Sequence, residues 1–543
     1  MRNTAAMDLP ARQRGIALLI LLAIVGMAVI FALVAGLNKS ANDLARARDL
    51  KTYAALAQAK AALIAYAVTY GDDPSHANPI PGYLPCPDLG PPASEGVAAS
   101  TCPLSGPSSL VSVLGRLPWK TLGLDTLRDG SGECLWYAVS GTYKNNPNGV
   151  SGNIFTSNMM NWDTNGQFDV MDADGTTFLA GATSDTNAVA VIFAPGTSLS
   201  GQNRTTPSAW LSPTNQVPAC GGNYTASAYL ETANGINNST LVTPTSPNPL
   251  VTDSSKFIAG TASDTFNDKL VYITRADIWN AIKKRSDFDN YLRAMTRLAA
   301  ECTATYGTNN SSWWDNRLPW ASALSLSGTS VPTYAVNARY DDVNSGMSGR
   351  LSFRVDTSRT ATANSLANST DYGTSGRYLF TPFPSYCGYS ADQKVWYDNW
   401  KDQLFYALSN EYKPSAGSFT SCGTCLKING SGNYAAVVIF AGDKLTDAAG
   451  QVTQPRSLAT DKGSIGNYLE LRNSSNHPNN AGNGNYQAAA ASSTFNDIVY
   501  GINASNLAVM CYKASTNAMV SVPAVPVAPP GSATAVKDYA ACL

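Results

Sequence analysis

The stretch Arg12-Gln-Arg-Gly-Ile-Ala-Leu-Leu-Ile-Leu-Leu-Ala-Ile-Val-Gly-Met-Ala-Val-Ile-Phe-Ala-Leu-Val-Ala-Gly-Leu37 places two arginines before a long uncharged run. Residues 16–37 are 22 uncharged, mostly aliphatic positions, and about 20 are enough to cross a bilayer as a helix. The run is longer than the apolar core of a signal peptide. Because the arginines precede it, the positive-inside rule predicts a cytoplasmic N-terminus and a head on the other side.

The helix is expected to continue beyond the apolar run. No proline occurs between Ala11 and Asp73. Apolar residues of the second half recur at helical spacing, namely Tyr53, Leu56, Leu63, Ala67 and Tyr70. Gly71-Asp72-Asp73-Pro74 then ends the pattern. The sequence therefore predicts one long transmembrane and stalk helix over residues 16–72.

The junction Arg12-Gln-Arg-Gly-Ile-Ala-Leu-Leu-Ile20 resembles the class III leader of type IV pilins and type II secretion pseudopilins. This resemblance implies that prepilin peptidase cuts after Gly15. Ile16 would then be the new, N-methylated amino terminus, and the helix would pack into the core of a filament. The implied partners are prepilin peptidase, the inner membrane and other major and minor pilins or pseudopilins.

One position departs from the pattern of that family. Most pilins carry Glu at the fifth mature position, where this chain has Ile20. That Glu pairs with the terminal ammonium of the neighbour above, and a buried carboxylate without a partner costs several kcal/mol. Its absence is typical of tip-capping subunits, such as the K pseudopilin and some X-type minor pilins. We expect a tip subunit; the alternative is a divergent minor subunit elsewhere in the filament.

Composition narrows the function further. Charged residues make up 14% of the 543 positions and the net charge is −1, which gives no basic surface for nucleic acid. The two histidines, His76 and His477, lie in loop-like stretches, so neither a His-dependent triad nor a multi-His metal site is expected. The sequence predicts a protein that is not an enzyme and binds no nucleic acid.

Four segments recur in the same order along the chain. Arg116-Leu-Pro-Trp119 recurs as Arg317-Leu-Pro-Trp320, Leu135-Trp-Tyr-Ala-Val-Ser140 is echoed by Leu404-Phe-Tyr-Ala-Leu-Ser409, Val191-Ile-Phe-Ala194 recurs as Val438-Ile-Phe-Ala441, and Thr265-Phe-Asn-Asp268 recurs as Thr494-Phe-Asn-Asp497. The helical segment 57–71 is likewise paralleled by 293–307. This order indicates an internal duplication.

We therefore expect an α+β fold: the long N-terminal transmembrane and stalk helix, followed by two tandem pilin-like lobes with antiparallel sheets. Strands are expected at residues 134–140, 188–194, 269–273, 404–408 and 435–441. The expected divisions are a leader at 1–15, the helix at 16–72, a first lobe at 73–274, a second lobe at 275–515 with an insertion around 321–400, and a Pro-rich tail at 516–543.

Ten cysteines are spread along the chain: Cys86, Cys102, Cys134, Cys220, Cys302, Cys387, Cys422, Cys425, Cys511 and Cys542. In an exported protein, scattered pairs are most simply structural disulfides. The sequence does not fix their pairing, although Cys511 is one candidate partner for Cys542. Cys422 and Cys425 have C-x-x-C spacing without a second such pair, so a structural disulfide is favoured over zinc or redox chemistry.

No cofactor is expected, apart from one candidate for calcium. Asp163, Asp169, Asp172 and Asp174 lie within a short acidic stretch, and calcium prefers six to eight oxygen ligands. Asp-Gly and Asn-Gly pairs are also typical of hairpin turns, so turns alone are the alternative.

Together these features predict a minor pilin or pseudopilin. It would prime or cap the tip of a type IV pilus-like or type II secretion filament, with a head that contacts a surface or substrate. The expected location is the bacterial inner membrane, single pass, with the N-terminus cytoplasmic and the head periplasmic, and then the filament tip or cell surface. The alternative is a single-pass membrane-anchored periplasmic binding protein or enzyme that does not polymerise.

Overall fold

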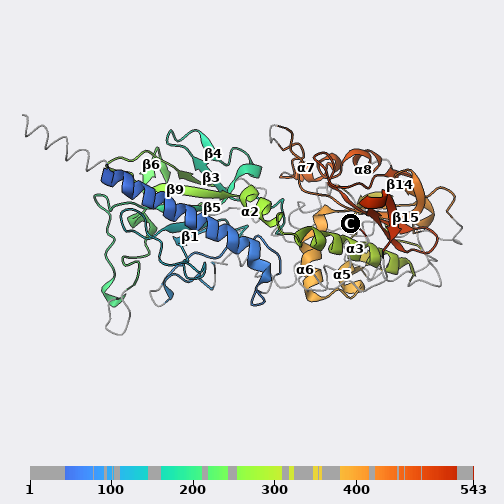
Figure 1. The fold of residues 1–543 in the computed structure, drawn as a ribbon, viewed down its shortest axis with the longest axis horizontal. Helices are drawn as coiled ribbons and strands as arrows, with labels where there is room; N and C mark the ends of the chain where they lie inside the picture. Colours follow the sequence, from blue (N-terminus) through green and yellow to red (C-terminus); the bar gives the residue numbers. More distant parts are fainter. Residues whose placement is uncertain are drawn as a thin grey trace, which may run out of the picture.

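A computed structural model describes residues 43–76, 79–90, 94–100, 102, 111–144, 160–210, 218–242, 254–308, 317–322, 324, 346–352, 354–356, 380–414, 422–448, 452–457, 459–477, 480–522 and 542. Figure 1 shows two bodies side by side, each with a helix lying along a sheet. We call them the first lobe, with strands β1 to β9, and the second lobe, with strands β10 to β19.

The first lobe holds a sheet of seven strands within the described residues. Its strands are β1 (Val113–Arg116), β2 (Trp136–Val139), β3 (Phe168–Met171), β4 (Phe178–Ala180), β5 (Ala188–Ala194), β8 (Ser255–Ile258) and β9 (Lys269–Thr274), and β6 (Thr232–Ala233) and β7 (Ile236–Asn237) form a separate hairpin. β1, β2, β5 and β9 pair as an antiparallel ladder. β3 joins β5 at one end, pairs with β4 and runs parallel to β8.

The N-terminal helix, residues 43–69, lies across this sheet (Figure 1, blue). Leu56, Ala59, Leu63 and Ala67 follow one another at three- and four-residue spacing and are fully buried. They share one core cluster with the inward-facing side chains of β2 and β5. The helix is therefore one-sided, as its sequence predicts.

The expected transmembrane and stalk helix is corrected by this structure. Among the residues that the structure describes, no helix is long and apolar enough to cross a membrane. The described helix has an apolar face that packs on the sheet and an opposite face that is exposed, so burial against protein accounts for its apolar side chains. The predicted single-pass localisation in the inner membrane is wrong by the same finding; the apolar run 16–37 itself lies outside the described residues.

The second lobe holds a sheet of eight strands within the described residues. Its strands are β10 (Ser348–Arg350), β13 (Leu404–Leu408), β14 (Leu426–Ile428), β15 (Ser431–Phe440), β16 (Asn485–Tyr486), β17 (Ile498–Asn503), β18 (Val509–Lys513) and β19 (Ala518–Ser521), and β11 (Arg354–Asp356) pairs separately with β12 (Phe380–Pro382). The helix α3 (Phe288–Thr308) lies against β15 and β17.

The second lobe repeats the plan of the first, down to one parallel pair in each sheet. β14 runs parallel to β16, as β3 runs parallel to β8, so the expectation of purely antiparallel sheets is also corrected. The five predicted strands are confirmed as β2, β5, β9, β13 and β15. The other helices are α2 (Arg275–Ile282), α5 (Phe383–Tyr386), α6 (Ala391–Trp400), α7 (Ala459–Lys462) and α8 (Leu471–Asn476).

One hydrophobic core runs through both lobes. It includes the buried faces of the N-terminal helix and of α3, the inward faces of both sheets, and the aromatic rings of α6. Trp396 and Trp400 of α6 lie within the predicted insertion and are almost completely buried, so they belong to the core. The two lobes therefore pack as parts of one body.

The buried ring of His477 predicts a loss of stability in acid. Its Nε2 donates to the carbonyl oxygen of Gly349 at 2.9 Å, and burial lowers the pKa of the ring to about 4. Between about pH 6.5 and pH 4 the His477 ring binds a proton in the unfolded chain but stays neutral in the folded chain. We expect the free energy of unfolding, measured in urea, to fall by roughly 3 kcal/mol as the pH is lowered across that range. It should fall by less in His477→Asn. Equal slopes for parent and variant would contradict this.

Candidate functional site

A network of buried polar side chains surrounds the repeated Phe-Asn-Asp segment of the first lobe. The backbone N–H groups of Asn267 and Asp268 donate to the Glu231 carboxylate at 2.9 and 3.1 Å. The Asp268 carboxyl accepts in return from the Glu231 backbone N–H at 2.9 Å and from the Asn238 side chain at 3.0 Å. These bonds tie the loop before β9 to the segment around Glu231.

The second lobe contains the same network. The backbone N–H of Asn496 donates to the Glu470 carboxylate at 3.2 Å. The Asp497 carboxyl accepts from the Glu470 backbone N–H at 3.2 Å and from the Asn473 side chain at 2.9 Å. The duplication seen in the sequence therefore extends to individual hydrogen bonds.

A Gln-x-Arg segment completes each network. In the first lobe, Gln202 donates to Glu231 at 2.6 Å and accepts from Arg204 at 2.7 Å. The Arg204 guanidinium also donates to the Gly196 carbonyl oxygen at 2.8 Å and lies 4.8 Å from the centre of the Tyr229 ring. The arginine thus joins the end of β5 to the same carboxylate.

The second lobe repeats this arrangement around Arg456. Gln454 donates to Glu470 at 2.9 Å and accepts from Arg456 at 3.2 Å. The Arg456 guanidinium donates to the Gly442 carbonyl oxygen at 2.9 Å and lies 4.5 Å from the centre of the Tyr468 ring. We call the two sets the carboxyl networks; their members are Gln202, Arg204, Glu231, Asn238 and Asp268 in the first lobe, and Gln454, Arg456, Glu470, Asn473 and Asp497 in the second.

Each carboxyl network holds two carboxyl groups in contact, away from water. Asp268 and Asp497 are 3% and 5% exposed. Burial, together with the neighbouring Glu231 or Glu470 carboxylate, raises the pKa of both aspartates well above the usual value. One oxygen of each aspartate, Oδ1, has no hydrogen-bond partner other than the neighbouring carboxyl. Burial and the adjacent carboxylate therefore favour the protonated form of each aspartate.

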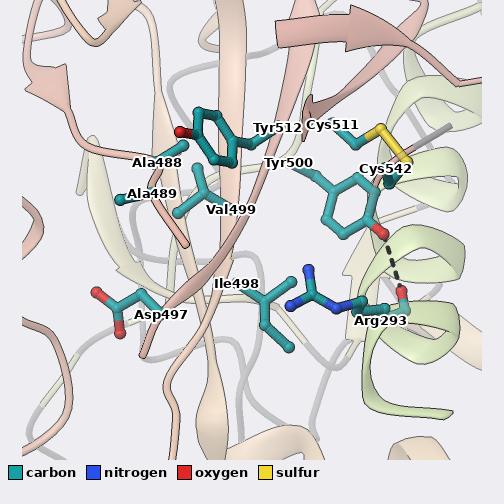
Figure 2. Close-up of a pocket in the computed structure, with 10 residues that line it drawn as sticks. All are labelled: Arg293, Ala488, Ala489, Asp497, Ile498, Val499, Tyr500, Cys511, Tyr512 and Cys542. Atoms are coloured by element: carbon teal, nitrogen blue, oxygen red, sulfur yellow. Dashed lines mark hydrogen bonds between the residues drawn. A yellow bond between two sulfur atoms is a disulfide. The ribbon is translucent and has the colours of Figure 1, made fainter. Parts of the chain in front are cut away.

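This geometry does not favour catalysis. A carboxyl pair that shares a proton is one way to build an acid–base site, but both pairs are buried. Asp497 lines a small pocket together with Arg293, Tyr500 and the Cys511–Cys542 disulfide. Figure 2 shows that its carboxylate points away from the Tyr500 ring, whose hydroxyl donates to the Arg293 carbonyl oxygen at 3.2 Å. The networks are therefore structural clamps.

Sequence reasoning found only part of these networks. The Phe-Asn-Asp repeat was visible, but two other signals were missed: Gln202-Asn-Arg204 recurs as Gln454-Pro-Arg456, and Tyr229-Leu-Glu231 recurs as Tyr468-Leu-Glu470. Each match is short by itself. The three motifs Gln-x-Arg, Tyr-Leu-Glu and Phe-Asn-Asp occur in the same order in both lobes, and this shared order could have identified the two networks.

Asp163 lies where the two lobes meet. We call residues 160–165 the junction loop; it leaves the first lobe and packs on the second. The Asp163 carboxylate lies 3.6 Å from the Arg456 guanidinium and 3.8 Å from the Lys444 ammonium, and it accepts from the Gln403 side chain at 2.6 Å. Lys444 also pairs with Asp185. This ion cluster links the first lobe directly to the carboxyl network of the second.

The rest of the junction loop adds apolar and polar contacts. The Trp162 ring lies 4.7 Å from the Trp400 ring and 5.7 Å from the Phe440 ring, centre to centre. The backbone N–H of Met160 donates to the Asn399 side chain at 2.7 Å, and the Asn161 side chain donates to the Asn399 carbonyl oxygen at 2.8 Å. The lobes are therefore held by a packed core as well as by charge.

The four calcium candidates lie in three different surroundings. Asp163 belongs to the ion cluster at the lobe junction. Asp169 accepts from the Asn187 side chain at 2.7 Å, and burial raises its pKa. Asp172 and Asp174 lie in the turn between β3 and β4, where Asp174 accepts from Thr176 and Thr177. Among the described residues, no group of three or more acidic, His or Cys side chains could hold a metal ion.

The predicted disulfides are confirmed for all ten cysteines. The pairs are Cys86–Cys102, Cys134–Cys220, Cys302–Cys387, Cys422–Cys425 and Cys511–Cys542. Cys511 and Cys542 are therefore partners, and the C-x-x-C pair forms its own bridge. The predicted processing residues Gly15 and Ile16, and the filament-core position Ile20, lie outside the described residues.

Comparison of the chain with models of known protein families, with curated proteins and with solved structures found no match.

Replacing the aspartates of the two carboxyl networks by asparagine should remove a pH dependence. The folded chain keeps protons on Asp268 and Asp497 that the unfolded chain releases above about pH 4, so parent stability falls as the pH rises. Between pH 5 and pH 8, we expect the urea midpoints of Asp268→Asn and Asp497→Asn to fall less than the midpoint of the parent protein. The alanine variants, which leave buried donors without acceptors, should lose about 1–3 kcal/mol. Identical slopes in parent and asparagine variants would contradict a raised pKa of these aspartates.

Removing the carboxylate of Asp163 should loosen the lobe junction. Asp163→Ala leaves the buried Arg456 and Lys444 side chains with less negative charge, which typically costs about 3–5 kcal/mol. We expect a lower melting temperature and faster proteolysis between the lobes. Asp264→Ala, at an exposed position, is the matched control. Equal melting temperatures for the two variants would show that the ion cluster contributes little.

Proposed function

We propose that this chain is a structural subunit of a type IV pilus-like or type II secretion filament, one that primes assembly or caps the tip. The observation that carries the proposal is the outer end of the N-terminal helix. Residues 43–51 are all exposed, and the apolar side chains of Leu44, Leu50 and Tyr53 are 55%, 72% and 54% exposed. Apolar residues at an exposed helix end are available for an interaction with another protein surface.

The repeated helix-on-sheet plan supports the same proposal. A helix laid along an antiparallel ladder is the plan that the leader-like segment Arg12–Ile20 implies, and the chain uses it twice. In a filament, the first helix would pack among the helices of neighbouring subunits, as ridges into grooves. The absence of Glu at position 20 favours the tip, where no neighbour lies above.

The head would act by shape and contact, without a chemical step. Both carboxyl networks are buried, and the junction holds the lobes as one body. Its partners would be prepilin peptidase and other major or minor pilins or pseudopilins, and the head would contact a surface or a secreted substrate. A binding protein or enzyme that never polymerises is the rival reading, and the experiments below separate the two.

Processing at the leader is the first test. Co-expression with a prepilin peptidase should remove residues 1–15 and leave Ile16 at the amino terminus, which intact-mass measurement detects. Gly15→Val should block the cut and serves as the control. A parent chain that keeps all of its leader in the native host would support the non-polymerising alternative.

Filament incorporation is the second test. Leu44→Glu with Leu50→Glu puts charges on the exposed end of the helix, so we expect at least about a tenfold loss of the chain from sheared filaments by immunoblot, with an unchanged melting temperature. Val242→Glu, which is also exposed but lies after β7, should be incorporated normally. Equal incorporation of both variants would contradict a packing role for this end of the helix.

A further inference from the structure

We propose that the outer edge of strand β9 is a docking site for an extended segment of another protein, which pairs with β9 as an additional antiparallel strand. This inference goes beyond the filament function and does not depend on it. We call the site the β9 edge; it consists of the backbone of Leu270 and Tyr272 and the side chains of Lys60, Phe178 and Leu179.

The second lobe shows the same strand position when it is filled. β9 and β17 are equivalent strands, because each directly follows a copy of the Thr-Phe-Asn-Asp repeat. Each pairs on one side with the central strand of its sheet, β5 or β15. On its other side β17 pairs antiparallel with β18, and Gly501 lies opposite Met510. Among the strands that the structure describes, none pairs with that side of β9.

The backbone of Tyr272 faces the open position. In β17 the Asn503 N–H donates to the carbonyl oxygen of Ala508, so Gly501, two residues earlier, also points toward β18. Tyr272 is the first-lobe equivalent of Gly501, and its carbonyl oxygen accepts from the Lys60 ammonium at 2.9 Å. A lysine side chain thus takes the place of the N–H that a paired strand would donate.

Lys60 is a cover that an incoming strand can displace. Its ammonium also pairs with Asp277 at 3.1 Å, and the two side chains are 32% and 33% exposed; an ion pair this exposed contributes little stability. The equivalent helix position in the second lobe is Thr296, which is fully buried and donates to the Leu292 carbonyl oxygen at 2.7 Å. A short side chain therefore lies where the strand is present, and a long, movable one lies where it is absent.

Exposed apolar side chains lie beside the β9 edge. Phe178 and Leu179 of β4 are 42% and 39% exposed. The Tyr272 hydroxyl donates to the Leu179 carbonyl oxygen at 2.9 Å, so β4 lies next to the Tyr272 ring. In the second lobe, Met510 of β18 packs against the core on the corresponding face of the sheet. A strand with apolar residues at alternate positions would cover Phe178 and Leu179 in the same way.

The strands at the ends of the two sheets, β1, β4, β10 and β19, offer no matching partner. β1 exchanges backbone hydrogen bonds with Asp88 through Arg116, and β10 does so with Ser322 through Arg350. β4 and β19 have three and four residues, against six in β9, and Pro523, which has no N–H, lies just beyond β19. A second copy of the chain thus offers no strand of this length at these ends, and the occupant is a segment of another protein.

A peptide probe and hydrogen exchange test the proposal. The probe is the strand that covers β17, Ala508–Lys513 with Cys511→Ser, added to the full-length chain. We expect amide exchange in residues 269–274, measured by mass spectrometry, to slow at least about fivefold, and exchange in residues 518–521 to stay unchanged. The same peptide with N-methyl groups on alternate residues lacks the hydrogen-bond donors and should give no protection.

Matched variants locate the binding. Tyr272→Pro removes an outward N–H, which an edge strand tolerates, and should abolish the protection of Leu270. Met519→Pro, the same change at the β19 edge, should leave that protection intact. Lys60→Ala uncovers the Tyr272 carbonyl oxygen and should bind the probe at least about threefold more tightly. This variant keeps the test decisive if Tyr272→Pro does not fold.

Three results would overturn the proposal. The first is unchanged exchange in residues 269–274 of both the parent and Lys60→Ala, and the second is equal protection by the N-methylated peptide. The third comes from the native host, where a benzoylphenylalanine in place of Leu179 should crosslink another protein at an extended segment with alternating apolar residues, as mapped by mass spectrometry. An adduct only with a second copy of this chain, or no adduct, would contradict the stated occupant.

Discussion

The buried contact between one aspartate and one glutamate side chain is the constraint on which each lobe depends. It joins the residues before β9 or β17 to a loop segment far away in the chain. Gln and Arg side chains then connect the same glutamate to the end of β5 or to the residues just after β15. A buried polar group that loses its hydrogen-bond partner destabilises the fold. The network therefore fixes one arrangement of loops that have little regular structure.

The two lobes share the same carboxyl network but differ in the carboxylate that pairs with its arginine. The same arginine position meets Glu133 of its own lobe in one copy and Asp163 of the other lobe in the second. In the second lobe the carboxylate comes from Asp163 of the first lobe, so Arg456 holds its own loop and also links the two lobes. Because Trp162 enters the aromatic core beside it, the junction combines charge with apolar burial, and the two lobes become one body.

The sequence predicted the regular elements better than the clamps. The runs 188–194 and 404–408 are strands because their apolar β-formers fit a buried sheet, and Thr274 caps α2 as its capping box indicates. The clamps consist of polar residues in loops, which follow no period. The repeated Val-Ile-Phe-Ala segment is shifted by one residue between the lobes. Val191 is buried on the side of its sheet away from the helix, whereas Val438 is buried on the helix side of its sheet, because side chains alternate along a strand. The membrane-spanning prediction was made on residues 16–37, which lie outside the described residues; the described helix, residues 43–69, packs on a sheet.

The contact between the lobes has a consequence for assembly. It joins two different faces, since a loop at one end of the first lobe meets the clamp at the opposite end of the second. A head-to-tail contact of this kind forms no closed pair. One face of the junction-loop type and one face of the carboxyl-network type therefore stay unused at the two ends. In this chain the clamp face of the first lobe stays at one end, beside exposed helix turns.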